Sequence, residues 1–336
     1  MLDPCRDPEP DGWEDFRQAE GLTPLWAYDV IGASCEGSWA RPLLAVFREG
    51  RRITAVIGAV YIGLRSPGSS RAPRPRREPI ILDVRLPGYS NGPTWHFSGE
   101  VSFEARCAML RLFERAAARR LGWGLAGTVY RMMTEPESPM VVRRGAIVRD
   151  SPGSTVMPLS WTSAEEWIGS LSRNRRSVLR RQLRRMEKAD DLIVTTGTVR
   201  SDLDPVELAE MNRRHTARLA ARLDPRAPLP AAYFDRLLRR EDVSVTTYHA
   251  GERLLAFAIL FDHGTTPVFA TWAALRPEDG GRKDLYFDAH ARLVRKVIED
   301  GKKELLGGRG LVEVKKSLGY EYVPMKLVAV PRWVMG

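Results

Sequence analysis

The sequence predicts a mixed α/β (α+β) fold arranged as two tandem domains. The length supports two domains, because 336 residues are too many for one average domain and suit two of roughly 150 residues. The second half carries three consecutive strand patterns followed by one long helix pattern. The first half repeats strand and helix patterns in the same order, which indicates a duplicated architecture.

The second half opens with helical patterns. Ser163 and Glu166 have the S-x-x-E spacing of a capping box, and apolar residues then recur at helical intervals over about 164–189. A short strand is expected over 192–196, because this segment is rich in β-branched residues. Pro205 follows an aspartate and suits the first position of the next helix.

A three-stranded pattern then precedes a long helix. Two strands flank the turn Gly251-Glu252, and a second turn at His263-Gly264 leads to a strand over 267–275. The long helix over about 284–300 ends before Gly301, a residue suited to the left-handed position after a helix. The other elements expected here are a helix over 231–240, a strand over 303–306, a helix over 311–318 and a strand over 325–330.

The first half repeats this scheme more weakly. Residues 45–63 share with 246–264 an aromatic residue, a glycine turn, an arginine and a long apolar strand, and 101–124 resembles 284–304 as a long helix ending at a glycine. No clear helix pattern precedes these elements in the first half. We therefore expect a degenerate N-terminal domain over 1–158 and a complete domain over 159–336.

Composition excludes several classes of protein. Three widely spaced cysteines and five histidines form no metal-ligand pattern, so no metal site and no disulfide framework is expected. The acidic N-terminus lacks the pattern of a signal peptide, and no apolar run reaches the about 18 residues that span a bilayer, so we expect a cytoplasmic protein. The net charge of +10 favours anionic partners, although general arginine enrichment explains it equally well.

One glycine-bearing loop is a candidate anion site. Gly280, Gly281, Arg282 and Lys283 stand between the strand over 267–275 and the following helix. Glycines permit close backbone approach to a ligand, and the amides and dipole of a helix N-terminus favour a pyrophosphate group. The two cations add positive charge at the same place. A plain turn is the alternative interpretation of this loop.

The C-terminal region carries a family signature. The stretch 307–320, GGRGLVEVKKSLGY, resembles the late G-rich and lysine motif of the Fem-like and CelD/BcsL-like branch of the GNAT acyltransferase superfamily. The basic helix over 170–188 and the segment 212–218 resemble the same branch. The resemblance extends over about 160–330, whereas over 1–155 it is one of architecture alone. It implies tandem GNAT-like domains, of which the first is degenerate.

The resemblance implies transfer of an acyl group to an amine. The first interpretation is an N-acyltransferase that acylates a primary amine of a small molecule or peptide in secondary metabolism. Its donor would be acyl-CoA or an acyl-carrier thioester, with no tightly bound cofactor. The second is a Fem-like transferase that uses aminoacyl-tRNA, and the third is a non-catalytic GNAT-like binding protein. The acceptor amine and the oligomeric state are left open.

The resemblance also implies site residues. Lys316, with Lys315 beside it, matches the lysine thought to stabilise the oxyanion or the acceptor. The catalytic tyrosine usual in GNAT proteins has no match between residues 305 and 318, so Tyr320 and Tyr322 are its candidate substitutes. The implied donor-binding residues are Gly280, Gly281, Arg282 and Lys283 for the pyrophosphate of coenzyme A, with Thr271 and Trp272 on the preceding strand beside the acyl group.

The sequence also contains basic segments and candidate general bases. Arg173, Arg176, Arg180, Arg184 and Lys188 form one stripe on the predicted helix, suited to RNA phosphates or an acidic carrier protein, or simply solvated. The Pro/Ser/Arg-rich segment 65–77 is expected to be an exposed loop.

No residue of the sequence stands out as the general base. Glu313 is expected at the surface, and Asp262 and His263 are expected at the far end of the strands.

Overall fold

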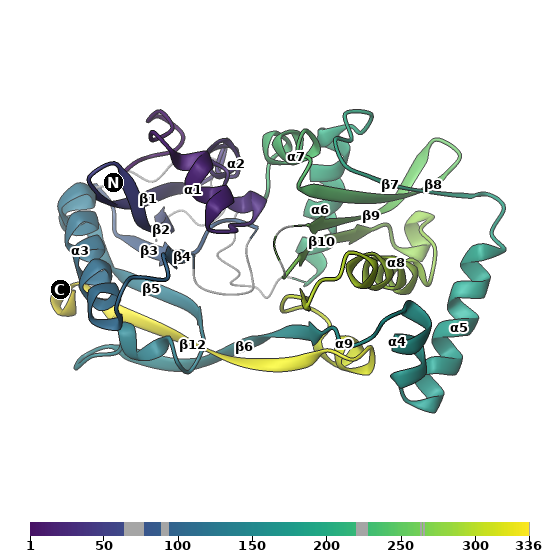
Figure 1. Ribbon diagram of the computed structural model, residues 1–336. Helices are drawn as coiled ribbons and strands as arrows, with labels where there is room; N and C mark the ends of the chain where they lie inside the picture. The colour runs from purple at the N-terminus through teal and green to yellow at the C-terminus, as the bar shows by residue number, and fades with distance from the viewer. Residues whose placement is uncertain (64–76, 89–93, 220–227, 263, 265, 336) are drawn as a thin grey trace. The chain divides into compact units, whose positions relative to one another are not determined.

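The computed structural model describes residues 1–63, 77–88, 94–219, 228–262, 264 and 266–335. The chain forms two compact units (Figure 1). The first unit comprises Met1–Gly153, Pro225–Tyr233 and Val323–Gly336, and the second comprises Ser154–Asp224 and Phe234–Tyr322. The segment 65–76 and His263, for which a loop and a turn were expected, lie outside the described residues. No helix of the described residues is long and apolar enough to cross a bilayer.

The sheet of the first unit is built from β1 (Ala40–Glu49), β2 (Arg52–Gly63), β3 (Ile80–Val84), β4 (Trp95–Phe97), β5 (Leu125–Met133) and β12 (Glu321–Pro331). β1, β2 and β3 form an antiparallel meander, and helix α3 (Phe103–Leu121) crosses over to β5, which pairs with β3 in parallel. β12 pairs with β5 antiparallel and completes the order β1-β2-β3-β5-β12, while β4 pairs with β2.

Side chains that alternate along β1 separate the two faces of this sheet. Leu43 packs with α3 on one face, whereas Leu44 packs on the other with helices α1 (Trp13–Ala19) and α2 (Tyr28–Ala33). The expectation of no early helices in the first half was therefore wrong. With seven and six residues, α1 and α2 are too short to produce a periodic apolar pattern in the sequence.

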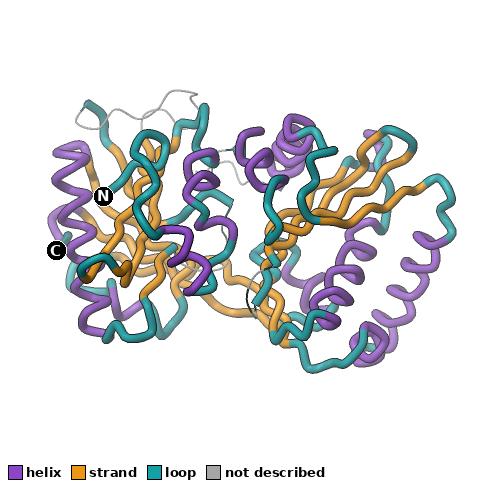
Figure 2. The backbone as a smooth tube through the Cα atoms, turned by 45° about the horizontal axis from the view of Figure 1, so that its top comes forward, coloured by secondary structure: helices purple, strands orange, loops and turns teal. Residues whose placement is uncertain are grey.

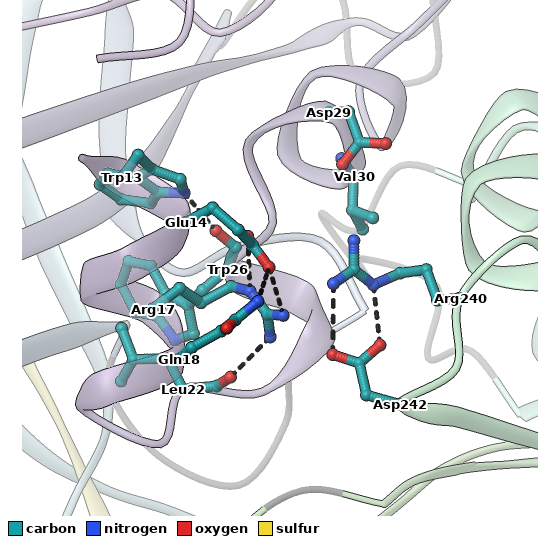
Figure 3. A network of polar contacts seen from close by, with 10 residues as sticks. All are labelled: Trp13, Glu14, Arg17, Gln18, Leu22, Trp26, Asp29, Val30, Arg240 and Asp242. Carbon is teal, nitrogen blue, oxygen red and sulfur yellow. Dashed lines mark hydrogen bonds and ion pairs between the residues drawn. The ribbon is translucent and has the colours of Figure 1, made fainter. Parts of the chain in front are cut away.

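A buried polar network holds α1 in place (Figure 3). Arg17 is only 2% exposed, and its guanidinium donates to Glu14 (2.7 and 2.9 Å) and to the Leu22 carbonyl (2.9 Å). The Trp13 indole donates to the Trp26 carbonyl at 2.8 Å. Because these groups satisfy one another, the network is structural.

The sheet of the second unit comprises the end of β6 (Ile147–Pro158), with β7 (Leu192–Gly197), β8 (Val243–Ala250), β9 (Arg253–Phe261), β10 (Val268–Ala274) and β11 (Glu304–Leu306). β7 to β10 are antiparallel neighbours in sequence order. Helix α8 (Leu285–Glu299) crosses over to β11, which pairs with β10 in parallel and with β6 antiparallel. The predicted order of strands and crossover helix in the second half is thus confirmed.

Helices cover both faces of the second sheet (Figures 1 and 2). One face carries α8 together with α4 (Ala164–Ser170) and α5 (Arg173–Glu187), whose buried residues form one core with those of the sheet. The opposite face carries α6 (Pro205–Leu219), which contacts β10, and α7 (Ala231–Leu238). Phe234 of α7 packs edge-on against Phe257 of β9, with ring centroids 5.9 Å apart.

The single helix expected over 164–189 is two helices. Ser163 caps α4 as expected, since its hydroxyl accepts from the Glu166 amide at 3.1 Å. The chain then becomes extended at Leu171, and the Ser172 hydroxyl caps α5 by accepting from the Arg175 amide at 3.3 Å. A serine that caps a new helix competes with continuation of the old one, which explains the break.

The two units share one strand pattern. Each has a three-stranded antiparallel meander, a crossover helix, a parallel strand and a final antiparallel strand. The final strands are exchanged relative to chain order: β12 joins the first unit from Val323, and β6 joins the second from Ser154. The compact units consequently differ from a simple division at residue 158, because strand pairing rather than chain order determines them.

Candidate active site

The parallel strands β10 and β11 meet at one position and then separate. Among the described residues their register contains one pair, Val268 with Leu306, after which β10 continues to Ala274. The chain following β11 turns toward β6, where the Gly307 amide donates to the Thr155 carbonyl at 2.8 Å. β10 also has a bulge after Phe269. Because of this opening, the backbone of β10 beyond Val268 has no strand partner on its β11 side within the described part of the chain.

A buried tyrosine–histidine pair lies at this opening. The Tyr320 hydroxyl and Nε2 of His290, on α8, are 3.0 Å apart, and their exposed fractions are 4% and 0%. Burial lowers the pKa of His290 to about 3, helped by the nearby charges of Lys315 and Arg175. Burial also raises the pKa of Tyr320 far above its usual value. Both groups are therefore neutral at physiological pH, with the phenol as a potential proton donor.

Lys315 is buried beside this pair. It lies on the short helix α9 (Val312–Ser317), is 5% exposed, and donates from Nζ to the Gly307 carbonyl. Burial lowers its pKa to about 8, close to physiological pH. The ammonium has three N–H groups, so donors remain for a substrate oxygen.

Lys316, its neighbour, points elsewhere. Its side chain is 45% exposed, pairs with Glu313 at 3.1 Å and lies 5.5 Å from the centroid of the Tyr322 ring. Tyr322 is itself 43% exposed. Of the expected catalytic group, the structure brings Lys315 and Tyr320 together in the interior and leaves Lys316 at the surface.

Arg175, Tyr286 and His290 complete the cluster, and the sequence interpretation missed all three. The His290 ring lies 4.7 Å from that of Tyr286 and 5.0 Å from that of Phe269, and the Arg175 guanidinium lies 4.2 Å over the Phe287 ring. Four buried atoms of these three residues have no hydrogen-bond partner among the described residues: His290 Nδ1, the Tyr286 hydroxyl, and Nε and Nη2 of Arg175.

A sequence signal for Arg175 did exist. Its spacing from Leu179, Gln182 and Met186, the buried residues of α5, is four, seven and eleven positions. It therefore belongs to the buried stripe and not to the basic one. An arginine in register with apolar residues is a stronger functional signal than one in a solvated row.

The two residues of β10 that were expected beside the acyl group, Thr271 and Trp272, have different neighbours in the structure. Trp272 is half-buried, with its ring 5.5 Å from that of Tyr286 and 6.3 Å from that of Tyr248. Thr271 follows the bulge and pairs with Ile259 of β9. Trp272 thus contacts the aromatic part of the cluster, whereas Thr271 contributes its position on the open strand.

The glycine loop is a closed turn. The Gly280 amide donates to the Pro277 carbonyl (3.1 Å) and the Gly281 amide to the Arg276 carbonyl (2.7 Å). A Cβ on Gly281 would lie 2.2 Å from the Leu275 carbonyl oxygen, so this glycine is required by backbone packing. The structure thus gives both glycines a turn function, and their amides are already used as donors.

The charges around this loop are mostly paired. Arg282 binds Asp191, and the Asp284 carboxylate accepts from Gln182 (2.8 Å) and pairs with Arg185. Lys283 is exposed and has no ion pair within the described part of the chain. A carboxylate therefore already lies at the start of α8, where an anionic ligand would otherwise be favoured.

The outer face of α5 is strongly basic. Arg173, Arg181 and Arg184 are exposed and form no ion pair with any described residue, whereas Arg180 pairs with Glu165 at 2.9 Å. Arg176 donates to the Gly169 carbonyl. Within the expected stripe, Arg176 and Arg180 thus bind other groups of the chain, whereas Arg173 and Arg184 have no ion pair with a described residue.

No group of acidic, histidine or cysteine side chains among the described residues is arranged to hold a metal ion.

Comparison with known proteins finds a family match within the second unit. Residues 173–316, from α5 through α9, match the model of the acetyltransferase (GNAT) domain family. The second unit is a GNAT acyltransferase domain. No match was found among curated protein sequences.

Solved structures show that the whole chain has a tandem GNAT fold. L-PGS from Bacillus licheniformis is 11% identical, with 96% of this chain and 92% of that chain covered and a TM-score of 0.61. FemX is 10% identical, with coverages of 98% and 97% and a TM-score of 0.58. A tandem GNAT protein from the clavulanic acid biosynthesis pathway is 10% identical, with coverages of 98% and 97% and a TM-score of 0.51. The chain therefore shares the double-GNAT fold of the Fem-like branch.

Proposed function

We propose that the second unit transfers an aminoacyl group from aminoacyl-tRNA to a primary amine of a small molecule or peptide. The observation that carries this proposal is that α5 presents arginines both to solvent and to the buried cluster. Its exposed Arg173, Arg181 and Arg184 face solvent, while Arg175 of the same helix reaches the buried cluster at the β10–β11 opening. One helix thus joins a surface suited to RNA phosphates with the interior where a bound acyl group would react.

The expected chemistry exchanges an ester for an amide. The neutral amine attacks the ester carbonyl, a C–N bond forms, and the C–O bond to the tRNA ribose breaks. The developing oxyanion requires donors, and the buried ammonium of Lys315 supplies spare N–H groups at the opening. The leaving ribose oxygen requires a proton, and we assign its delivery to the Tyr320 phenol. The attacking amine gives up one proton to solvent, and Tyr320 regains one proton from solvent.

The glycine loop supports an RNA donor over coenzyme A. The amides of Gly280 and Gly281 already donate within their turn, and Asp284 brings a carboxylate to the start of α8. A pyrophosphate at this place would meet fewer free donors and one like charge. An aminoacyl-tRNA donor also agrees with the FemX-like fold, and its use would place the reaction in the cytoplasm.

An acyl-CoA or acyl-carrier thioester is the second candidate donor. Two observations favour it: the matching family is one of acetyltransferases, and the exposed Lys283 beside Arg282 keeps positive charge at the crossover loop. At the same opening, Lys315 would then donate to the thioester carbonyl oxygen, and Tyr320 would give a proton to the thiolate leaving group.

One experiment separates the two donors. The purified chain is incubated with an amine mixture and either a labelled aminoacyl-tRNA pool or a set of labelled acyl-CoA thioesters, with and without ribonuclease. The proposal predicts labelled amide from aminoacyl-tRNA, abolished by ribonuclease and reduced steeply by added salt. Product from a thioester alone, unaffected by the nuclease, would replace the proposed donor with the second candidate.

A further inference from the structure

Two cations of the second unit, the half-buried Arg175 and the buried Lys315, have no acidic partner among the described residues. The Arg175 guanidinium lies over the Phe287 ring, which contacts Tyr286 and, through Tyr286, His290. Lys315 donates to the carbonyl of Gly307, which lies against Tyr320, the hydrogen-bond partner of His290. Both cations also act electrostatically on His290. Desolvation lowers the pKa of each, and no acidic side chain in the described part of the chain offsets this effect. The carboxylates on the adjoining helix are used elsewhere, because Asp284 binds Gln182 and Asp288 binds Tyr248 and Arg292. Positive charge in this region is therefore uncompensated by the described residues.

The unpartnered atoms of Arg175 are on one edge of its guanidinium. Nε and Nη2 present two parallel N–H bonds, whose spacing matches the two oxygens of a carboxylate. The Phe287 ring, 4.2 Å away, holds the plane of the guanidinium without neutralising it. The fully buried His290 offers Nδ1 without a partner among the described residues, and the Tyr286 hydroxyl adds another such group.

We propose that Arg175, together with Lys315 and the Tyr286 hydroxyl, binds a carboxylate group of a substrate. The surrounding rings of Phe269, Tyr286 and Phe287 suit the short carbon chain that would carry it. The inference deepens the proposed function, on which it rests for the identity of the substrates. The carboxylate belongs either to the transferred aminoacyl group or to the acceptor amine.

Binding is tested first, without any transfer reaction. Ligand-observed NMR titrations of the full chain compare glutaramate with glutaramide, which has nearly the same shape and no charge. We expect glutaramate to bind at least about tenfold more tightly than glutaramide. Arg175→Gln should remove this preference, Arg175→Lys should restore only part of it, and Arg213→Gln, on the surface of α6, should leave it unchanged. Circular dichroism and Tm confirm that each variant is folded.

Three outcomes would overturn the inference. They are equal binding of the two probes, an undiminished preference in folded Arg175→Gln, and tighter Arg175-dependent binding of inorganic phosphate than of glutaramate. The transfer assay then identifies the source of the carboxylate. A preference for glutamyl- over glutaminyl-tRNA that Arg175→Gln abolishes assigns it to the donor, and a preference for acidic acceptors assigns it to the acceptor. If no transfer occurs while the probe preference holds, the proposed function fails and the carboxylate site stands.

Discussion

The Tyr320 hydroxyl and Nε2 of His290 form a buried, uncharged pair at 3.0 Å. Burial holds the pKa of His290 at about 3 and keeps the pKa of Tyr320 far above neutrality, so neither group ionises at physiological pH. A phenol in this state retains its proton until a stronger base develops beside it. The oxygen that leaves during acyl transfer would be such a base.

Removing the Tyr320 hydroxyl should slow transfer without unfolding the protein. We expect Tyr320→Phe to reduce kcat by about 100-fold, because the proton donor is lost while the ring still fills its place. Single-turnover transfer rates measure the effect. Tyr322→Phe is the matched control, since Tyr322 is 43% exposed, and it should retain the normal rate. A Tyr320→Phe rate close to that of the unchanged protein would rule out the proton-donor assignment.

The two adjacent lysines should differ in importance. Lys315→Met removes a buried ammonium at the opening, and we expect a loss of about 100-fold in transfer rate. Lys316→Met removes an exposed ion pair with Glu313, and we expect less than about a twofold change. Rates for both variants, measured under identical conditions, check this. The reverse order would assign the oxyanion function to Lys316.

The pKa of Lys315 predicts how transfer depends on pH. If the charged ammonium stabilises the oxyanion, the rate should fall as pH rises through about 8, where Lys315 loses its proton. The falling limb should be absent from the residual activity of Lys315→Met. A pH profile of single-turnover rates on both sides of this value shows the limb or its absence. A limb that persists in the variant would belong to another group.

The same pKa predicts a change in stability. The folded protein releases the Lys315 proton at about pH 8, whereas the unfolded chain keeps it up to the ordinary value of 10.5. Between these values the unfolded state binds more protons, so the free energy of unfolding should rise with pH relative to Lys315→Met. Below the folded-state pKa the difference between the two proteins should be constant. Urea unfolding at several pH values measures this, and a difference that falls across the window would be inconsistent with a lowered pKa.

Substitution by alanine should have opposite effects on the free energy of unfolding at two glycines. Gly281→Ala would place a Cβ 2.2 Å from the Leu275 carbonyl oxygen, and we expect a loss of about 2 kcal/mol in the free energy of unfolding. Gly169 lies in α4 with open space at its Cβ position, so Gly169→Ala should gain about 0.5 kcal/mol. Chemical denaturation compares the two. A neutral Gly281→Ala would show that the turn is not tightly packed.

Much of the element order could be predicted from the sequence, whereas strand exchange could not. The hairpin of β8 and β9 and the helix α8 have long apolar patterns bounded by Gly251 and Gly301, and both left-handed glycines occur where expected. The pattern of β12 predicts a strand but not its partner, because alternating apolar residues suit many neighbours. Its pairing with β5 in the first unit is a property of the tertiary structure.

The site was predictable only in part. The late lysine motif lies on a short helix, as predicted, but consecutive residues on a helix point about 100° apart, and the motif did not show that Lys315 is the buried one. His290 and Arg175 come from elements distant in the sequence from Tyr320, and packing alone brings them together. The glycine pair indicated a ligand loop, yet the amides of both glycines are used within the turn.

Aminoacyl transfer is best tested by comparing the unchanged protein with Tyr320→Phe in the presence and absence of ribonuclease. With labelled aminoacyl-tRNA and a mixture of primary amines, we predict a ribonuclease-sensitive labelled amide whose rate of formation falls about 100-fold in the variant. Formation of no amide from any aminoacyl-tRNA, or of one at the same rate in both proteins, would contradict an aminoacyl-transfer site at the opening between β10 and β11.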